Sequence, residues 1–340
     1  MKTNSTNQKH ESFLTDSFGR IGKKLRISIT DRCNLQCVYC MPKNNNNWID
    51  SKDILTFDEM IRFASVMSKL GIENIRLTGG EPLLRSNIEI LVENLSKITG
   101  IKKISMTTNG ILLSDKISQL KKSGLSSINI SLDTFNHEKF KKINGTDKLD
   151  QVLESIKVAS KIQMSIKINN VVMRGWNDDE VVDFARFSKS TGHPVRFIEF
   201  MPLDGSGIWN ENLVVIKHEI MSKIRREIGK LIPLDIDHSS PARSYTFSDG
   251  KGIIGFIPSI SEPFCQNCDR VRITSDGHFL TCLFEKPGFD IKALLREWKS
   301  DKEMANFIQN CISKKPEGII QIIRDKQLKP SLNQMNMIGG

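Results

Sequence analysis

Six β-like stretches alternate with amphipathic segments between residues 25 and 201, and this alternation limits the possible folds more than any other feature. The strand candidates span residues 25–30, 74–79, 103–108, 127–132, 166–173 and 195–201. The clearest helix candidate starts with a capping box at Thr56 and Glu59 and stops at Gly71. Strands and helices that alternate over short connections favour a parallel sheet. Because a closed barrel needs eight such units, we predict an open, six-stranded (β/α)6 partial TIM barrel.

The pattern changes after about residue 204. A helix candidate over 217–229 precedes two short β-like stretches, 243–248 and 252–258, joined through Asp249 and Gly250. We predict a smaller α+β region that covers the open side of the barrel. The predicted parts are a polar leader (1–17), the barrel (18–203), the C-terminal region (204–325) and a tail (326–340) that ends in two glycines.

Composition narrows the class of protein. The 340 residues are 39% hydrophobic, which suffices for a large core. The N-terminus has no signal-peptide pattern and no 18 apolar residues run together, so we expect a cytoplasmic protein with no membrane partner. The net charge is +10, but it comes mostly from scattered lysines that a solvated surface would explain. If an anion binds, a phosphorylated small molecule fits better than nucleic acid.

Six of the seven cysteines form two groups. The first group, Cys33, Cys37 and Cys40, has the spacing C-x3-C-x2-C directly after the first strand candidate. In a cytoplasmic chain such a cluster points to metal binding rather than to disulfides. A structural zinc site requires four protein ligands. Three thiolates instead suit a [4Fe–4S] cluster in which one iron has no cysteine ligand and is open to another group. The isolated Cys311 lies in a helical pattern and is interpreted as a buried apolar residue.

The second group, Cys265, Cys268 and Cys282, has the spacing C-x2-C-x13-C. Zinc with His278 as the fourth ligand is one interpretation, but the first group favours a second [4Fe–4S] cluster. The stretch 270–282 reads as a hairpin that turns at residues 276–277. Arg270 and Arg272 share one face of its first strand and could bind a phosphate group.

The first cysteine group, with Tyr39 before its third cysteine, and the segment "TGGEP" at 78–82 resemble the radical S-adenosylmethionine (SAM) superfamily. The resemblance implies that the amino and carboxylate groups of SAM take the open iron. It also implies SAM contacts that would come from Tyr39, Gly80, Ser131 and Met201.

Four segments together resemble the GTP 3′,8-cyclase family of molybdenum cofactor biosynthesis over about residues 18–340: "CNLQCVYCMP", "RLTGGEPLLR", "FCQNCDRVR" and the terminal "IGG". The resemblance implies two [4Fe–4S] clusters, SAM, and radical cyclisation of GTP. It further implies an external flavodoxin- or ferredoxin-like electron donor, and a homodimer is possible. The implied GTP-binding residues are Arg26, Arg76, Thr107, Lys167, Arg270, Val271 and Arg272, and the implied catalytic residues are Arg196, Gly339 and Gly340.

Two alternatives remain open at this point. One is another radical SAM enzyme with an auxiliary cluster, such as a peptide maturase, although such enzymes tend to carry more C-terminal cysteines. The other is a zinc-stabilised nucleic-acid-binding protein. The chain has only two tyrosines and no basic helix, so the features that would favour nucleic-acid binding are missing.

Overall fold

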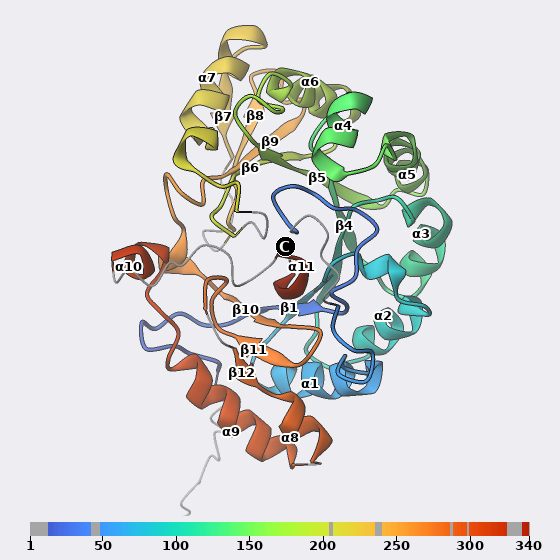
Figure 1. The fold of residues 1–340 in the computed structure, drawn as a ribbon, viewed down its shortest axis with the longest axis vertical. Coiled ribbons are helices and arrows are strands. Elements are labelled where there is room, and N and C mark those ends of the chain that lie inside the picture. The colour runs from blue at the N-terminus through green and yellow to red at the C-terminus, as the bar shows by residue number, and fades with distance from the viewer. Residues whose placement is uncertain are drawn as a thin grey trace, which may run out of the picture.

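A computed structural model describes residues 13–41, 48–203, 207–234, 240–285, 288–297, 299–324 and 335–339. Its centre is a ring of strands surrounded by helices (Figure 1). Among the described helices, none is long and apolar enough to cross a membrane.

The six predicted strands form the middle of one sheet, in sequence order and all parallel. They are β1 (Lys24–Ser28), β2 (Asn74–Thr78), β3 (Lys103–Thr108), β4 (Ser127–Ser131), β5 (Ser165–Val172) and β6 (Val195–Glu199). The sheet does not close, because its outermost strands pair on one side only. The open partial barrel is therefore confirmed.

Helices cover the outside of these strands (Figure 1). They are α1 (Phe57–Lys69), α2 (Ile88–Ser96), α3 (Leu113–Lys122), α4 (His137–Asn144), α5 (Leu149–Lys161) and α6 (Val181–Thr191). The predicted capping box at α1 is present: Thr56 Oγ1 accepts from the backbone N–H of Glu59, and the Glu59 carboxylate accepts from the backbone N–H of Thr56. The described residues also form three short 3-10 helices: η1 (Pro82–Leu84), η2 (Glu211–Leu213) and η3 (Cys265–Asn267).

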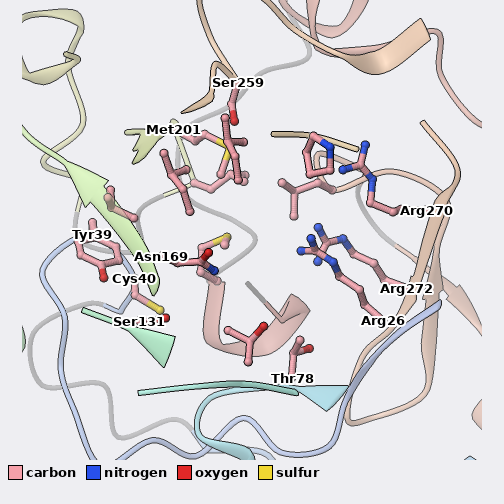
Figure 2. Close-up of a pocket in the computed structure, with 18 of the residues that line it drawn as sticks. Arg26, Tyr39, Cys40, Thr78, Ser131, Asn169, Met201, Ser259, Arg270 and Arg272 are labelled. Carbon is pink, nitrogen blue, oxygen red and sulfur yellow. The ribbon is translucent and has the colours of Figure 1, made fainter. Parts of the chain in front are cut away.

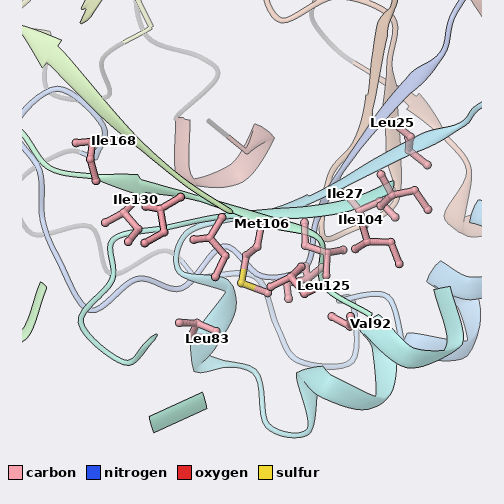
Figure 3. Close-up of a cluster of buried hydrophobic side chains, with 14 of the residues drawn as sticks. Leu25, Ile27, Leu83, Val92, Ile104, Met106, Leu125, Ile130 and Ile168 are labelled. Atoms are coloured by element: carbon pink, nitrogen blue, oxygen red, sulfur yellow. The ribbon is translucent and has the colours of Figure 1, made fainter. Parts of the chain in front are cut away.

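Successive side chains along each strand point alternately to the outer face of the sheet, which packs against the helices, and to the inside of the barrel. Leu25 and Ile27 of β1 are fully buried in the apolar layer between strands and helices (Figure 3). Arg26 lies between them in sequence, so its side chain points to the opposite face. The outer face of the sheet therefore supplies stability, and the inner face is free for polar groups.

The C-terminal region covers the open side by extending the sheet at both edges. Strand β9 (Ile253–Ile257) pairs with β6, and β10 (Arg270–Ile273) pairs with β1, both parallel. The edges of a six-stranded sheet carry unpaired N–H and C=O groups, which these strands satisfy. The other strands are β7 (Leu231–Pro233), β8 (Arg243–Phe247), β11 (His278–Leu280) and β12 (Phe289–Asp290), and the helices are α7 (Lys217–Glu227), α8 (Lys292–Arg296), α9 (Asp301–Ile312), α10 (Ile319–Arg324) and α11 (Met335–Ile338).

The N-terminal segment joins the core earlier than the boundary predicted at residue 18. Leu14 is fully buried, and its backbone N–H donates to the carbonyl of Leu70 at 3.0 Å. The Asp16 carboxylate pairs with the buried Arg20 guanidinium at 2.6 Å. Packing thus begins within the predicted leader, because an apolar residue at position 14 finds a place against α1. Residues 204–206, where the second boundary was predicted, lie outside the described residues.

Candidate active site

A cavity of about 300 Å³ lies at the carboxyl ends of the parallel strands, where barrel chemistry is expected (Figure 2). All six grouped cysteines line it. The other predicted site residues that line it are Tyr39, Gly80, Ser131, Met201, Arg26, Arg76, Thr107, Arg196, Arg270 and Arg272. Two cysteine groups that are separated by more than 220 residues in the sequence therefore face one space.

Two of the predicted GTP-binding side chains do not line this cavity. Val271 is 1% exposed and belongs to the apolar core, because it alternates with the two arginines of β10. Its side chain cannot contact GTP in the cavity. Lys167 on β5 is half-buried near Arg196; burial, and then the charge of Arg196, lowers its pKa to about 8.

The TGGEP segment lies directly against the chain that enters the first cysteine group. Gly80 donates its backbone N–H to the carbonyl of Thr30 at 2.8 Å. A Cβ at position 80 would lie 2.2 Å from the carbonyl oxygen of Arg32, and one at Gly79 would lie 2.4 Å from that of Thr30. Backbone atoms cannot yield at such distances, so both positions require glycine. This approach places the segment next to Cys33.

Tyr39 and Cys37 are held by residues that the sequence did not reveal. The Tyr39 hydroxyl donates to Asp133 at 2.5 Å, and the other Asp133 oxygen accepts from the backbone N–H of Val171 at 2.8 Å. The Cys37 thiol donates to the side chain of Asn144, at the end of α4, at 3.0 Å. The only sequence signal for Asp133 was its place just after β4.

Glu81 is a second buried carboxylate that sequence reasoning missed. It accepts from Thr108 Oγ1 at 2.7 Å and from the backbone N–H of Asn109 at 2.8 Å. Burial raises the pKa of Glu81 to about 7. The Asn109 amide lies 3.9 Å from the sulfur of Cys33. Glu81 therefore ties the end of β3 to the TGGEP segment beside the first cysteine group.

The cysteine thiols sit in environments that suit metal ligation. Burial raises the pKa of Cys33 to about 11, of Cys40 to about 12 and of Cys282 to about 11. Burial also acts against the Cys268 thiolate, but Arg270 and Lys315 outweigh it and bring the pKa of that thiol to about 7. Buried thiolates need compensating cationic charge, which iron supplies. The donor set of two triads fits two iron–sulfur clusters.

The single-zinc interpretation of the second group loses its proposed fourth ligand. His278 pairs with Asp276 at 3.1 Å and is absent from the cavity lining, so its imidazole lies elsewhere. Among the described residues, no three Cys, His, Asp or Glu side chains are close enough together to hold one metal ion. Cys311 is 3% exposed within the apolar core, as predicted.

Three arginines stand side by side on the inner face of neighbouring strands. Arg26 on β1 is in register with Arg272 on β10 and with Arg76 on β2. Burial, and then the charges of the neighbouring arginines, holds the pKa of Arg26 well below its usual range. Burial likewise lowers the pKa of Arg76 and of Arg272 to about 10. Like charges this close destabilise one another unless an anion neutralises them.

Arg270 adds a fourth guanidinium to this wall of the cavity, in which Figure 2 shows Arg26, Arg270 and Arg272 pointing the same way. Its guanidinium carbon lies 4.6 Å from the centre of the Phe264 ring, and its Nη2 is buried without a hydrogen-bond partner among the residues that the structure describes. Phe264 was not identified from the sequence. A buried guanidinium N–H that faces a cavity is suited to donate a hydrogen bond to a phosphate oxygen.

Within the C-terminal tail, helix α11 lies in the same cavity, between the arginines and the first cysteine group (Figure 2). Arg272 Nη1 donates to the carbonyl of Gly339, and Asn336 Nδ2 donates to the carbonyl of Asp31 at 3.0 Å. Gly339 has φ 74°, and a Cβ there would lie 2.0 Å from Thr78 Oγ1. The basic residue that meets the tail is thus Arg272. Gly340 lies outside the described residues.

Comparison with known proteins agrees with this geometry. Residues 27–188 match the model of the radical SAM superfamily, and residues 193–320 match Molybdenum Cofactor Synthesis C. The chain is 41% identical to the GTP 3′,8-cyclase of Thermodesulfovibrio yellowstonii over 96% of this chain and 100% of that protein. It is also 41% identical to human molybdenum cofactor biosynthesis protein 1, over 94% of this chain and 50% of that protein.

Among solved structures, Streptococcus suis SuiB bound to S-adenosylmethionine is similar with a TM-score of 0.60. That likeness covers 90% of this chain and 75% of SuiB at 15% identity, so it shows the fold alone. The high identity over nearly the full length decides the relationship instead. This chain belongs to the GTP 3′,8-cyclase family of the radical SAM superfamily.

Proposed function

We propose that this chain converts GTP to (8S)-3′,8-cyclo-7,8-dihydroguanosine 5′-triphosphate, the first step of molybdopterin biosynthesis. The observation that carries the proposal is one cavity that joins two cysteine triads to a row of arginines. A peptide substrate does not require a buried guanidinium cluster of this size, and a cavity of about 300 Å³ fits a small phosphorylated molecule better than a nucleic acid. A nucleoside triphosphate supplies the negative charge that the cluster lacks.

The proposed cofactor sites follow the two walls of the cavity. Cys33, Cys37 and Cys40 would hold the first [4Fe–4S] cluster, and Cys265, Cys268 and Cys282 the second. When bound, the first cluster supplies the electron that cleaves SAM and starts the radical reaction. Tyr39, Gly80, Ser131 and Met201, which also line the cavity, would bind and orient SAM.

The proposed GTP site is the cationic wall. Arg26, Arg76, Arg270 and Arg272 would bind the triphosphate, and Thr107 would contribute a further contact from β3. Lys167 on β5 does not line the cavity, so its half-buried side chain would have to turn toward GTP to contribute. Val271 can contribute only its backbone, since its side chain lies in the core. Arg196, Gly339 and Gly340 remain the candidates for the radical step. The docked tail supports this role for Gly339, because its carbonyl accepts a hydrogen bond from Arg272, which lines the cavity.

The proposal also covers the localisation of the enzyme, its electron donor and its oligomeric state. We expect a cytoplasmic enzyme that receives electrons from a flavodoxin- or ferredoxin-like donor and can form a homodimer. The predicted division into leader, barrel, C-terminal region and tail is kept as part of the same proposal, except that Leu14 and Asp16 at the end of the leader pack with the barrel.

The test is anaerobic incubation of the reconstituted protein with SAM, a strong reductant and GTP. We expect one cyclised nucleotide product, detected by mass spectrometry, together with methionine and 5′-deoxyadenosine. A control reaction with ATP in place of GTP should give no cyclised product. SAM cleavage without any change to GTP, in protein that carries about eight irons, would contradict the proposal.

A further inference from the structure

A buried lysine holds the second cysteine group from behind. Lys315, between α9 and α10, is 4% exposed. Its Nζ donates to the backbone carbonyl of Cys268 at 3.0 Å and to that of Arg270 at 3.1 Å. One ammonium thus fixes the chain at a proposed cluster ligand and at a proposed phosphate ligand. No motif in the sequence pointed to this residue.

The residues after Lys315 continue the same contact. The carbonyls of residues 316 and 317 accept from the guanidinium of Arg20 at 2.7 Å, and that guanidinium also donates to the carbonyl of Cys265 at 2.9 Å. A Cβ at Gly318 would lie 2.5 Å from the Cβ of Cys265. Segment 315–318 therefore fits closely around the second cysteine group.

The third cysteine of the group is held by a charged side chain of opposite sign. The Glu285 carboxylate accepts from the backbone N–H of Cys282 at 3.2 Å and from Thr281 Oγ1 at 2.8 Å. Each cysteine backbone thus has its own charged neighbour: Arg20 for Cys265, Lys315 for Cys268 and Glu285 for Cys282.

The charge of Lys315 distinguishes it from a simple structural clamp. Within the described part of the chain its hydrogen-bond partners are backbone carbonyls, which are neutral. Hydrogen bonds to neutral carbonyls leave a buried ammonium costly, and the Glu285 carboxylate, which interacts with it electrostatically, offsets part of that cost. A further anion nearby would stabilise it more. A [4Fe–4S] core together with its three thiolates carries a net negative charge. Reduction makes this charge more negative by one unit per electron. A fixed cation beside it favours the reduced form, because net charge is one of the factors that set cluster potentials.

We propose that Lys315 is a positioning residue for the second cysteine group, whose buried charge raises the reduction potential of the cluster bound there. The proposal rests on the two-cluster function proposed above. It predicts that a neutral hydrogen-bond donor at position 315 keeps the backbone contacts but lowers the potential.

The experiment is a potentiometric titration of the full-length, anaerobically reconstituted enzyme, followed by electron paramagnetic resonance. In Lys315→Gln the second cluster should have a more negative potential, with about a tenfold lower ratio of reduced to oxidised cluster at a given applied potential, equal to about 59 mV for one electron. The first cluster in the same sample serves as the internal reference and should not move. Lys315→Arg should keep the wild-type potential, and so should the matched control Lys314→Gln, whose side chain is exposed.

The possible failures separate the two proposals. About four irons per wild-type chain would overturn the two-cluster function itself. Eight irons with an unchanged second potential in Lys315→Gln would overturn only the role of Lys315. If Lys315→Gln loses the second cluster, Lys315→Arg decides: a retained cluster at wild-type potential supports the charge role, and a lost or shifted cluster refutes it.

Discussion

Replacement of Gly339 by alanine should release the tail from the cavity without damaging the fold. Alanine at φ 74° costs about 1–2 kcal/mol relative to glycine. The new Cβ would also lie 2.0 Å from Thr78 Oγ1, so the tail cannot stay where it is. The displaced tail can no longer keep the charge-assisted hydrogen bond from Arg272, which removes a further roughly 1.5–3 kcal/mol from the docked state. Relative to the wild type, the docking equilibrium should therefore shift toward the undocked tail by about two to three orders of magnitude.

Hydrogen exchange followed by mass spectrometry measures docking directly. In the ligand-free wild type, the amide of Gly339 donates to the carbonyl of Met335 at 3.0 Å and should exchange slowly; in Gly339→Ala the tail should exchange as an unstructured peptide does. Cyclisation should fall sharply, while both clusters stay bound. A tail peptide supplied in trans should restore part of the activity.

The matched control is Gly192→Ala. Gly192 has φ 76°, and a Cβ there would have no neighbour within 4 Å, so alanine adds the same backbone cost without a clash. That variant should lose some stability but no tail protection. Slow tail exchange together with full turnover in Gly339→Ala would refute the docking argument.

Three further predictions concern the clusters and the GTP site. Cys37→Ser should abolish SAM cleavage, whereas Cys268→Ser should spare some 5′-deoxyadenosine formation and remove the cyclised product; equal losses would show that the two groups are not separate. Arg270→Ala and Arg272→Ala should each weaken GTP binding at least tenfold and SAM binding far less, as measured by calorimetry. Burial, and then the charge of Arg196, lowers the pKa of Lys167 to about 8. GTP binding to the charged form therefore takes up a proton where Lys167 is neutral and should weaken about fivefold from pH 8 to pH 9. Lys167→Arg keeps its charge and should remove that dependence; an equal decline in this variant would assign it to another group.

The amino-acid sequence by itself determined the strand and helix order and the two sets of cysteines. These features are local, because each depends only on residues that are close together in the sequence. They are the repeat of apolar residues every two or every 3.6 positions, the capping box at Thr56 and the short spacing between thiols. The predicted side-chain alternation at Arg270 and Arg272 is present for the same reason. Val271 was expected to bind GTP only because of the family resemblance. The alternation that turns Arg270 and Arg272 toward the cavity buries the Val271 side chain in the core.

Only the tertiary structure decided which distant residues meet. The row of Arg272, Arg26 and Arg76 depends on the register of β10, β1 and β2, and no local pattern encodes how strands from opposite ends of the chain align. Buried partners such as Asp133 and Lys315 look like ordinary charged residues until the fold places them beside Tyr39 and Cys268. Their roles come from contacts across many residues of chain, where desolvation and geometry, rather than residue type, set what a side chain does.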